Sequence, residues 1–303
     1  MRSLRPGFRA FRRTLSRIAG EFFAHAVPTQ AAALAFYALF SLAPLLLVVI
    51  FIAGLVWGAD AVQGRIVGEF GGMMGSGAAE VVQGLLRKVS RPREGGFASV
   101  LGFLTIVVGA TGVFIQLQGA LNTVWDVRPE PGHGFAALLR KRLLSFSLLL
   151  VVGFLLLVSL ALSAALTALG QYIDTHSSIP AGYLQAAETL LSFTVITLLL
   201  ATIYRWLPDA EIQWRDVWIG SLVTALLICA GKWGISLYLG RTAVTSAYGA
   251  AGSVVIILLW VYYVSLLLLI GAEFTHVHTL EFREAVRPPS PWARRAASGR
   301  LPT

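Results

Sequence analysis

The sequence is poor in charged residues and has a single cysteine. Only 13% of its 303 residues are Asp, Glu, Lys or Arg, whereas soluble domains carry about 25%. A chain with so few charged groups cannot cover a water-exposed surface of this size, which excludes a soluble enzyme and a disordered protein. Cys229 has no second cysteine to pair with, so a secreted disulfide scaffold is excluded as well.

Motifs for nucleotide and metal chemistry are also absent from the sequence. The glycine-rich run at 71–77 lacks the G-K-[ST] ending of a phosphate loop, and we interpret it as a flexible hinge. The five histidines form no H-E-x-x-H pattern. Only His276 and His278 are close together, and we interpret them as a chance surface pair rather than a metal site. We therefore expect no enzymatic activity, no cofactor and no metal.

Long apolar segments are what the sequence has in abundance. Apolar residues make up 56% of the chain on a count that leaves out the 30 glycines, against a globular norm of about 45–50% that includes glycine. A membrane-spanning helix needs about 20 such residues. Six segments qualify: Ala31–Trp57, Phe97–Val124, Leu143–Leu169, Tyr183–Tyr204, Val217–Leu239 and Tyr248–Ala272. The predicted fold class is all-α, a polytopic membrane protein with six transmembrane helices.

The basic residues indicate how these spans are oriented. The net charge is +9, and 17 of the 24 Lys and Arg residues lie in segments that the six-span order places on the same side as both termini. Six lie on the other side. Because Lys and Arg collect in cytoplasmic loops, both termini are predicted to be cytoplasmic. This topology accounts for the positive charge without a nucleic-acid partner. Separately, we expect the first span to be an uncleaved signal-anchor.

Three flanking segments complete the predicted organisation. Residues 1–29 form a basic amphipathic helix, which either lies in the headgroup region on anionic lipid or packs under the protein's own cytoplasmic face, and both roles can hold together. The outer loop at 58–96 is predicted to contain two short amphipathic helices, around 62–70 and 78–89. Residues 30–280 form the six-span domain, and residues 281–303 a disordered basic tail.

Ionisable residues inside predicted spans are candidates for function, since charge in lipid is costly. Glu188 near the start of the fourth span, Lys232 in the fifth and Arg241 at its end all fall towards the outer side. They either line an outward-facing polar cavity, or Lys232 and Glu188 pair structurally or extend to the interface. The two readings are about equally favoured.

Amides and a proline mark two further spans. Gln116, Gln118 and Asn122 lie near the inner end of the second span, and Gln118 and Asn122 share a helix face. Because amides in lipid need partners, hydrogen bonding between helices is favoured over contact with a substrate. Pro44 lies inside the first span and is predicted to kink it.

Several stretches resemble the YihY/BrkB family of bacterial inner-membrane proteins. They are AAALAFYALFSLAP at 31–44, LNTVW at 121–125, YGAAGS at 248–253, LWVYY at 259–263 and GAE at 271–273. The resemblance covers about residues 20–280 and implies six spans, in agreement with the count above. A ribonuclease label and a virulence label have been attached to this family, but the resemblance implies no catalytic residue.

Two functions remain open at this point. The first is the movement of a lipid or other amphiphile across or within the membrane for envelope maintenance, along a path lined by Lys232, Glu188, Arg241, Gln116, Gln118, Asn122, Tyr37 and Trp260. The second is a non-transporting scaffold for envelope assembly. We disfavour ribonuclease activity, because no cluster of acid–base or metal-binding residues is visible. The expected partners are membrane lipids, and a second copy or an envelope protein is compatible with the sequence.

Overall fold

The computed structural model describes residues 8–74, 76–89, 112–129, 182–241, 252–282 and 293–295, and this part of the chain is almost entirely helical. The helices are α1 (Phe8–Ala24), α2 (Val27–Trp57), α3 (Ala59–Met74), α4 (Ser76–Val89), α7 (Gly182–Trp206), α8 (Trp214–Arg241) and α10 (Gly252–Phe282). Residues 112–124 form a further helix. The two strands, β1 (Val127–Pro129) and β2 (Ala293–Arg295), have three residues each. The predicted all-α class is confirmed for these residues.

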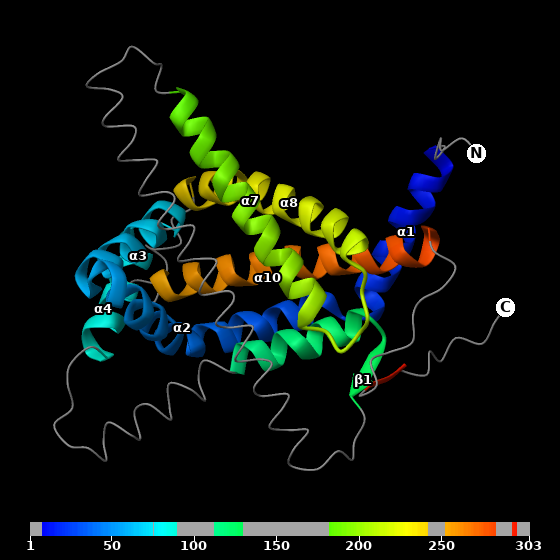
Figure 1. Ribbon diagram of the computed structural model, residues 1–303, viewed down its shortest axis with the longest axis horizontal. Helices are drawn as coiled ribbons and strands as arrows, with labels where there is room; N and C mark the ends of the chain where they lie inside the picture. Colours follow the sequence, from blue (N-terminus) through cyan, green and yellow to red (C-terminus); the bar gives the residue numbers. More distant parts are fainter. Residues whose placement is uncertain are drawn as a thin grey trace.

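Helix α10 is the central element and packs against α1, α2, α4 and α8 (Figure 1). Its 31 residues correspond to about 46 Å at 1.5 Å per residue, which exceeds the hydrocarbon thickness of about 30 Å. Glu273 is the only Asp, Glu, Lys or Arg between positions 252 and 280. The helix continues ten residues past the predicted end of the sixth span. Glu273 and His276 lie in this extension.

Candidate membrane spans cover Thr189–Trp206, Trp214–Gly231 and Gly252–Leu280 among the described residues. The count becomes four if Thr14–Ala24 and Val27–Leu42, a bent pair, cross the membrane as one broken span. These helices coincide with the predicted fourth, fifth, sixth and first spans. The predicted third span and residues 97–111 of the second lie outside the described residues, so the total of six stays a prediction.

A bend of 56° separates α1 from α2. Ala26 at the bend has φ 48° and ψ 43°, a left-handed conformation that non-glycine residues rarely adopt. Pro28 follows in the first turn of α2, where its missing N–H breaks no helical hydrogen bond. His25 is thereby held on a turn between two helices. Helix α2 is continuous from Val27 to Trp57, and the kink at Pro44 stays a prediction.

Helices α3 and α4 form a hairpin against α2 and α10 at one end of the bundle (Figure 1). The two helices predicted around 62–70 and 78–89 are confirmed as α3 and α4, and the end of α3 and the start of α4 both fall within the glycine-rich run. Their apolar faces join α2 in one buried cluster, formed by Leu46, Ile50, Val62, Val82 and Leu86. The hairpin is thus held to the bundle by apolar burial.

The opposite end of the bundle gathers α1, β1, β2 and the end of α10 (Figure 1). Strand β1 pairs antiparallel with β2, and Val127 lies opposite Arg295. The tail was expected to be disordered, whereas Ala293–Arg295 form this strand. Helix α1 packs against α10 and α2, with Phe22 against the main apolar core and Leu15 exposed. Packing of α1 on the protein itself is thus observed, Leu15 leaves one apolar side chain exposed, and contact of this helix with lipid stays a prediction.

Candidate functional site

Buried polar side chains concentrate towards the end of the bundle where α1 meets α10. Glu21 of α1, Asn122 of the 112–124 helix, and Glu273 and His276 of α10 are all buried there. Burying such groups is costly unless they are paired. Specific polar contacts therefore organise this end of the molecule. We take it as the candidate functional site.

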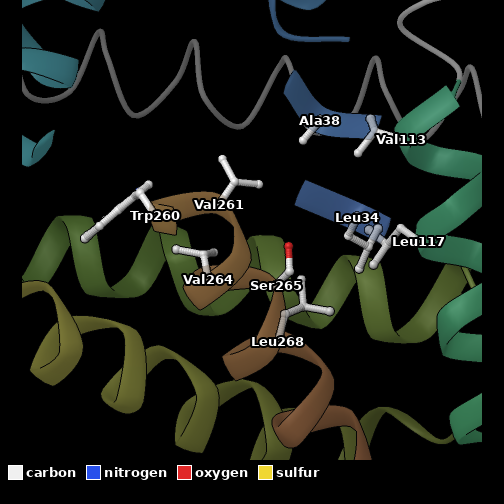
Figure 2. Close-up of a pocket in the computed structure, with 9 residues that line it drawn as sticks. All are labelled: Leu34, Ala38, Val113, Leu117, Trp260, Val261, Val264, Ser265 and Leu268. Carbon is white, nitrogen blue, oxygen red and sulfur yellow. The ribbon is translucent and has the colours of Figure 1, made fainter. Parts of the chain in front are cut away.

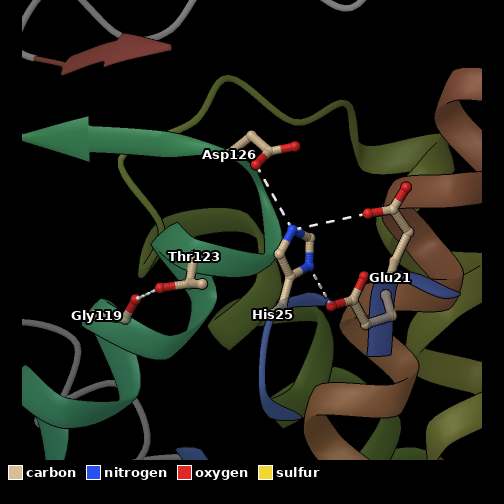
Figure 3. A network of polar contacts seen from close by, with 6 residues as sticks. Glu21, His25, Gly119, Thr123 and Asp126 are labelled. Carbon is tan, nitrogen blue, oxygen red and sulfur yellow. Dashed lines mark hydrogen bonds and ion pairs between the residues drawn. The ribbon is translucent and has the colours of Figure 1, made fainter. Parts of the chain in front are cut away.

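His25 lies at the centre of a group that we call the imidazole–carboxylate cluster, formed by Glu21, His25, Asp126 and Glu273 (Figure 3). Its Nδ1 is 2.6 Å from Oε1 of Glu273. Its Nε2 is 3.8 Å from Oε2 of Glu21 and 3.6 Å from Oδ1 of Asp126. Only the first distance is a hydrogen bond, and the other two are close enough for charge interaction or for a bridging water.

The cluster is assembled from three separate parts of the chain. His25 stands on the α1–α2 turn, Glu273 on α10, and Asp126 on the turn after the 112–124 helix, where its φ is 52°. Asp residues tolerate this left-handed conformation better than most. The side chains form a gradient of exposure: that of Asp126 is 46% exposed, that of His25 10% and that of Glu273 0%.

The carboxylates favour the protonated imidazole. The hydrogen bond with Glu273 raises the pKa of His25 above its ordinary value, and the negative charges of Glu273, Asp126 and Glu21 act in the same direction while burial opposes them. His25 lies on the turn outside both helices of the bent pair. The cluster can therefore hold a proton on His25 at the end of the bundle, close to a fully buried carboxylate.

Three buried polar atoms in or beside the cluster have no hydrogen-bond partner among the protein's own described groups. They are Oε2 of Glu273, Nδ1 of His276 and Nε1 of Trp125. The rings of Trp125 and His276 are 5.0 Å apart. Unpaired buried groups cost about 1–3 kcal/mol each, and proteins usually satisfy them with ordered water. These atoms give the cluster a capacity to hold further polar molecules.

The three amides predicted in the second span all bond to other elements of the protein. Nε2 of Gln116 donates to Oε1 of Gln30 on α2 at 3.2 Å. Asp209, in the connection between α7 and α8, accepts from Nδ2 of Asn122 at 2.8 Å and from Nε2 of Gln118 at 3.3 Å. The backbone N–H of Asp209 donates to Oδ1 of Asn122. These bonds correspond to the predicted role of joining helices.

An apolar cavity of about 180 Å³ lies between α2, the 112–124 helix and α10 (Figure 2). It is lined by Leu34, Ala38, Val113, Leu117, Trp260, Val261, Val264, Ser265 and Leu268. Of these, Trp260 is a predicted path residue. A dry cavity of about 150 Å³ can bind benzene, so this one has room for a ring or a short length of alkyl chain.

The remaining predicted path residues are placed as follows. Tyr37 is 44% exposed on α2, packs edge-to-face on Phe36 and does not line the cavity. Lys232 and Arg241 lie on α8 and Glu188 on α7, but their side chains lie outside the described residues, as does that of Pro44. The outward-facing polar cavity stays a prediction.

The cluster was missed by the sequence reasoning, and one interpretation was wrong. His276 is not a surface residue, since it is 4% exposed. His278 points elsewhere and stacks on Phe274. Glu273, the only Asp, Glu, Lys or Arg between positions 252 and 280, was the signal available. Its partner His25 lies 248 positions away, and nothing local in the sequence connects them. No group of three or more metal-ligating side chains is found within the described ranges.

Comparison with known proteins finds one matching family and several related membrane proteins. The profile of the family described as virulence factor BrkB matches residues 18–297. A UPF0761 membrane protein of Verminephrobacter eiseniae is 30% identical over 71% of this chain and 49% of its own length. The corresponding values for one from Azotobacter vinelandii are 31%, 84% and 60%, and for one from Ralstonia nicotianae 27%, 97% and 63%. The chain thus spans about half of the first relative and under two thirds of the others. No solved structure matches.

Proposed function

The chain belongs to the virulence factor BrkB family, and from that premise we propose that it is a six-span protein of the bacterial inner membrane that moves a lipid or similar amphiphile across or within the membrane. Its relatives are named as membrane proteins, and the described helices are apolar and long enough to span. The proposal includes no chemical step and no nucleic acid.

The apolar cavity carries this proposal. Its walls come from α2 and α10 within candidate spans and from the 112–124 helix, which supports a position at the depth of the acyl chains. Ser265 supplies a hydroxyl in a lining that is otherwise almost wholly apolar. Ligand sites commonly have this composition, an apolar wall with few polar groups. An acyl chain is the part of an amphiphile that such a cavity would accommodate.

The arrangement of the two ends supports the proposed orientation. Helix α1 and strands β1 and β2 lie at one end, and the α3–α4 hairpin lies at the other (Figure 1). The shared end of α1 and β2 supports the same side for the N-terminal segment and the tail, as an even number of spans requires. Since 17 of the 24 Lys and Arg residues belong to that side in the six-span order, we place it in the cytoplasm.

Binding is tested with a phosphatidylethanolamine that carries a photoactivatable diazirine in its acyl chain. Purified protein in nanodiscs should be labelled on peptides from α2 or α10, and Val264→Trp, which fills the cavity, should reduce that labelling several-fold. Leu222→Trp on the exposed side of α8 is the matched control and should leave it unchanged. Equal labelling in both variants would contradict a role for the cavity.

Transport is tested separately with a fluorescent phosphatidylethanolamine in proteoliposomes. The wild-type protein should move the probe between leaflets faster than empty liposomes, and both Val264→Trp and Lys232→Ala should slow it. A wild-type rate equal to that of empty liposomes would overturn transport and favour the scaffold function. In that case, substitutions inside the membrane would act only through stability, and crosslinking would recover a protein partner.

A further inference from the structure

We propose that Asp126, His25 and Glu273 form a proton relay, and that the proton bound by Glu273 is the ion whose gradient drives the movement proposed above. The second half of this inference rests on the proposed function. The first half, a proton-binding site at the α1–α10 junction, stands on the geometry alone and has its own test.

The relay is indicated by the order of exposure along three side chains. Asp126 is nearly half exposed, His25 is mostly buried and Glu273 is fully buried. The imidazole stands between the two carboxylates, with Nε2 3.6 Å from Asp126 and Nδ1 2.6 Å from Glu273. A gap of 3.6 Å exceeds a direct hydrogen bond, so transfer across it uses a water molecule. Among the described residues, the imidazole is thus the group that the short contacts place between half-exposed Asp126 and buried Glu273.

The proposed transfer uses both ring nitrogens of His25: one nitrogen gains a proton and the other loses one. With the neutral imidazole protonated on Nδ1, a proton from Asp126 or its water binds Nε2. The Nδ1 proton passes to Oε1 of Glu273, which becomes a carboxylic acid, and the ring is left neutral with its hydrogen on Nε2. Reversal of these steps returns the proton to the side of Asp126, so coupling to a gradient requires that the proton on Glu273 leave towards the opposite side of the membrane. Histidine suits this role because it can carry a proton on either nitrogen.

The surroundings of Glu273 favour the binding of a proton there. An ionised carboxylate inside a low-dielectric bundle is unfavourable unless it is well paired, and Oε2 of Glu273 has no partner among the described groups. Within the described ranges, the other charged or titratable groups that act on the junction are Arg17 and Glu21 on α1 and His276 on α10. His276, one turn along from Glu273, also has an unpartnered nitrogen, so water can bridge the two.

Protonation at this point can influence the cavity because His25 directly precedes, and Glu273 belongs to, a helix that forms one of its walls. His25 lies two residues before α2, whose Leu34 and Ala38 line the cavity, and Glu273 lies five residues after Leu268 on α10. The His25–Glu273 hydrogen bond therefore ties the beginning of α2 to α10. Converting Glu273 from carboxylate to acid changes this bond from charge-assisted to neutral, and charge-assisted bonds are roughly twice as strong.

The proton site is tested by infrared spectroscopy on the purified full chain, through the carbonyl stretch of a protonated carboxylic acid. A pH titration should show a buried acid band that is lost in Glu273→Gln and retained in Glu80→Gln, which removes an exposed acid from α4. In Asp126→Asn the band should persist, but its response to a pH jump should be several-fold slower. A band unaffected by Glu273→Gln would overturn the relay.

Two further variants keep the test decisive if Glu273→Gln does not fold. His25→Gln removes Nδ1, which accepts from the Glu273 acid once the proton has been transferred, and should shift the frequency of the Glu273 band because the acid loses this hydrogen-bonding partner. The exposed Asp126→Asn leaves the buried bond intact and should fold normally. If the band keeps both its frequency and its pH-jump rate in these variants, the assignment of the relay is wrong.

Coupling is tested with the fluorescent lipid probe under an imposed pH gradient. The wild-type rate should change several-fold with the gradient, and Glu273→Gln should abolish that response. A gradient response that persists in Glu273→Gln would overturn coupling through this site. If the infrared band behaves as expected but no lipid moves in the wild type, the proton site is supported and the proposed function is overturned.

Discussion

Gly271 of α10 and Thr224 of α8 pack so closely that a Cβ on the glycine would overlap the threonine hydroxyl. The contact is reciprocal, since a Cβ on Gly220 of α8 would overlap the hydroxyl of Thr275 on α10. Each threonine Oγ1 donates to the backbone carbonyl four residues before it on its own helix, at 2.7 Å. Small residues at an interface let two helices approach closely in a membrane. Here the two glycines allow α8 and α10 to pack closely where they cross.

Adding a methyl group at this crossing should destabilise the bundle. Gly271→Ala must push apart α8 and α10, and overpacking of this kind costs about 1–3 kcal/mol. The measurement is the fraction of monodisperse protein that survives heating in detergent. Gly119→Ala is the control, because a Cβ there meets nothing within 4 Å and alanine favours a helix. Equal heat resistance of the two variants would contradict the close contact.

Removal of the Tyr204 hydroxyl should weaken the same crossing from a third helix. Tyr204 of α7 is fully buried, and its O–H donates to the carbonyl of Leu268 at 2.6 Å and lies 3.1 Å from Oγ1 of Thr224. Tyr204→Phe leaves that carbonyl with one partner fewer, and we expect a loss of about 0.6–1.7 kcal/mol, as for other hydrogen bonds between membrane helices. Steric-trap unfolding in bicelles measures it, with the exposed Tyr37→Phe as the control that should show no loss.

Asn122 and Asp209 should be energetically coupled. The side chain of Asn122 both donates to and accepts from Asp209, at 2.8 Å in each case, which fastens the 112–124 helix to the α7–α8 connection. A double-mutant cycle with Asn122→Ala and Asp209→Ala should give a coupling energy within the usual range of about 0.5–3 kcal/mol. Thr123→Ala is the control, since that hydroxyl bonds only within its own helix. Additive effects of the two substitutions on stability would show that Asn122 and Asp209 do not interact.

The contribution of His25 to stability should depend on pH. Its pKa is raised in the folded protein, mainly by the hydrogen bond with Glu273, so the folded state binds the His25 proton more tightly than the unfolded state does. This contribution is complete below the unfolded pKa of about 6.5 and is lost as pH rises through the higher folded value. The difference in melting temperature between wild type and His25→Gln should therefore shrink from pH 6 to pH 9. A difference that grows over that range would contradict the assignment.

The orientation can be tested with single cysteines in a Cys229→Ser background. Arg17→Cys on α1 and Gln83→Cys on α4 both place a thiol at an exposed position, at opposite ends of the bundle. In intact cells, a membrane-impermeant maleimide that reaches the periplasm should label the α4 site and spare the α1 site until the cells are opened. The reverse pattern would invert the proposed topology.

The sequence by itself determined the elements whose information is local. The apolar runs predicted the fourth and fifth spans to within a few residues of α7 and α8, and the apolar periodicity predicted α1, α3 and α4. Such patterns are set by neighbours three or four positions apart, because each helix must turn its apolar side towards the core or the lipid. The charge asymmetry likewise gave a topology that agrees with the shared end of the two terminal segments.

Only the tertiary structure decided which polar groups meet. His25 and Glu273 are 248 positions apart, and Asn122 and Asp209 are 87 apart. Pairs so far apart produce no repeating pattern of residues in the sequence. His276 looked like half of a surface pair, yet the packing of Trp125 against it places it inside. Lipid fixes which segments must be helical because their backbones need internal hydrogen bonds. Which buried polar side chains become partners depends on how the helices cross, and that was settled by close contacts such as Gly271 on Thr224.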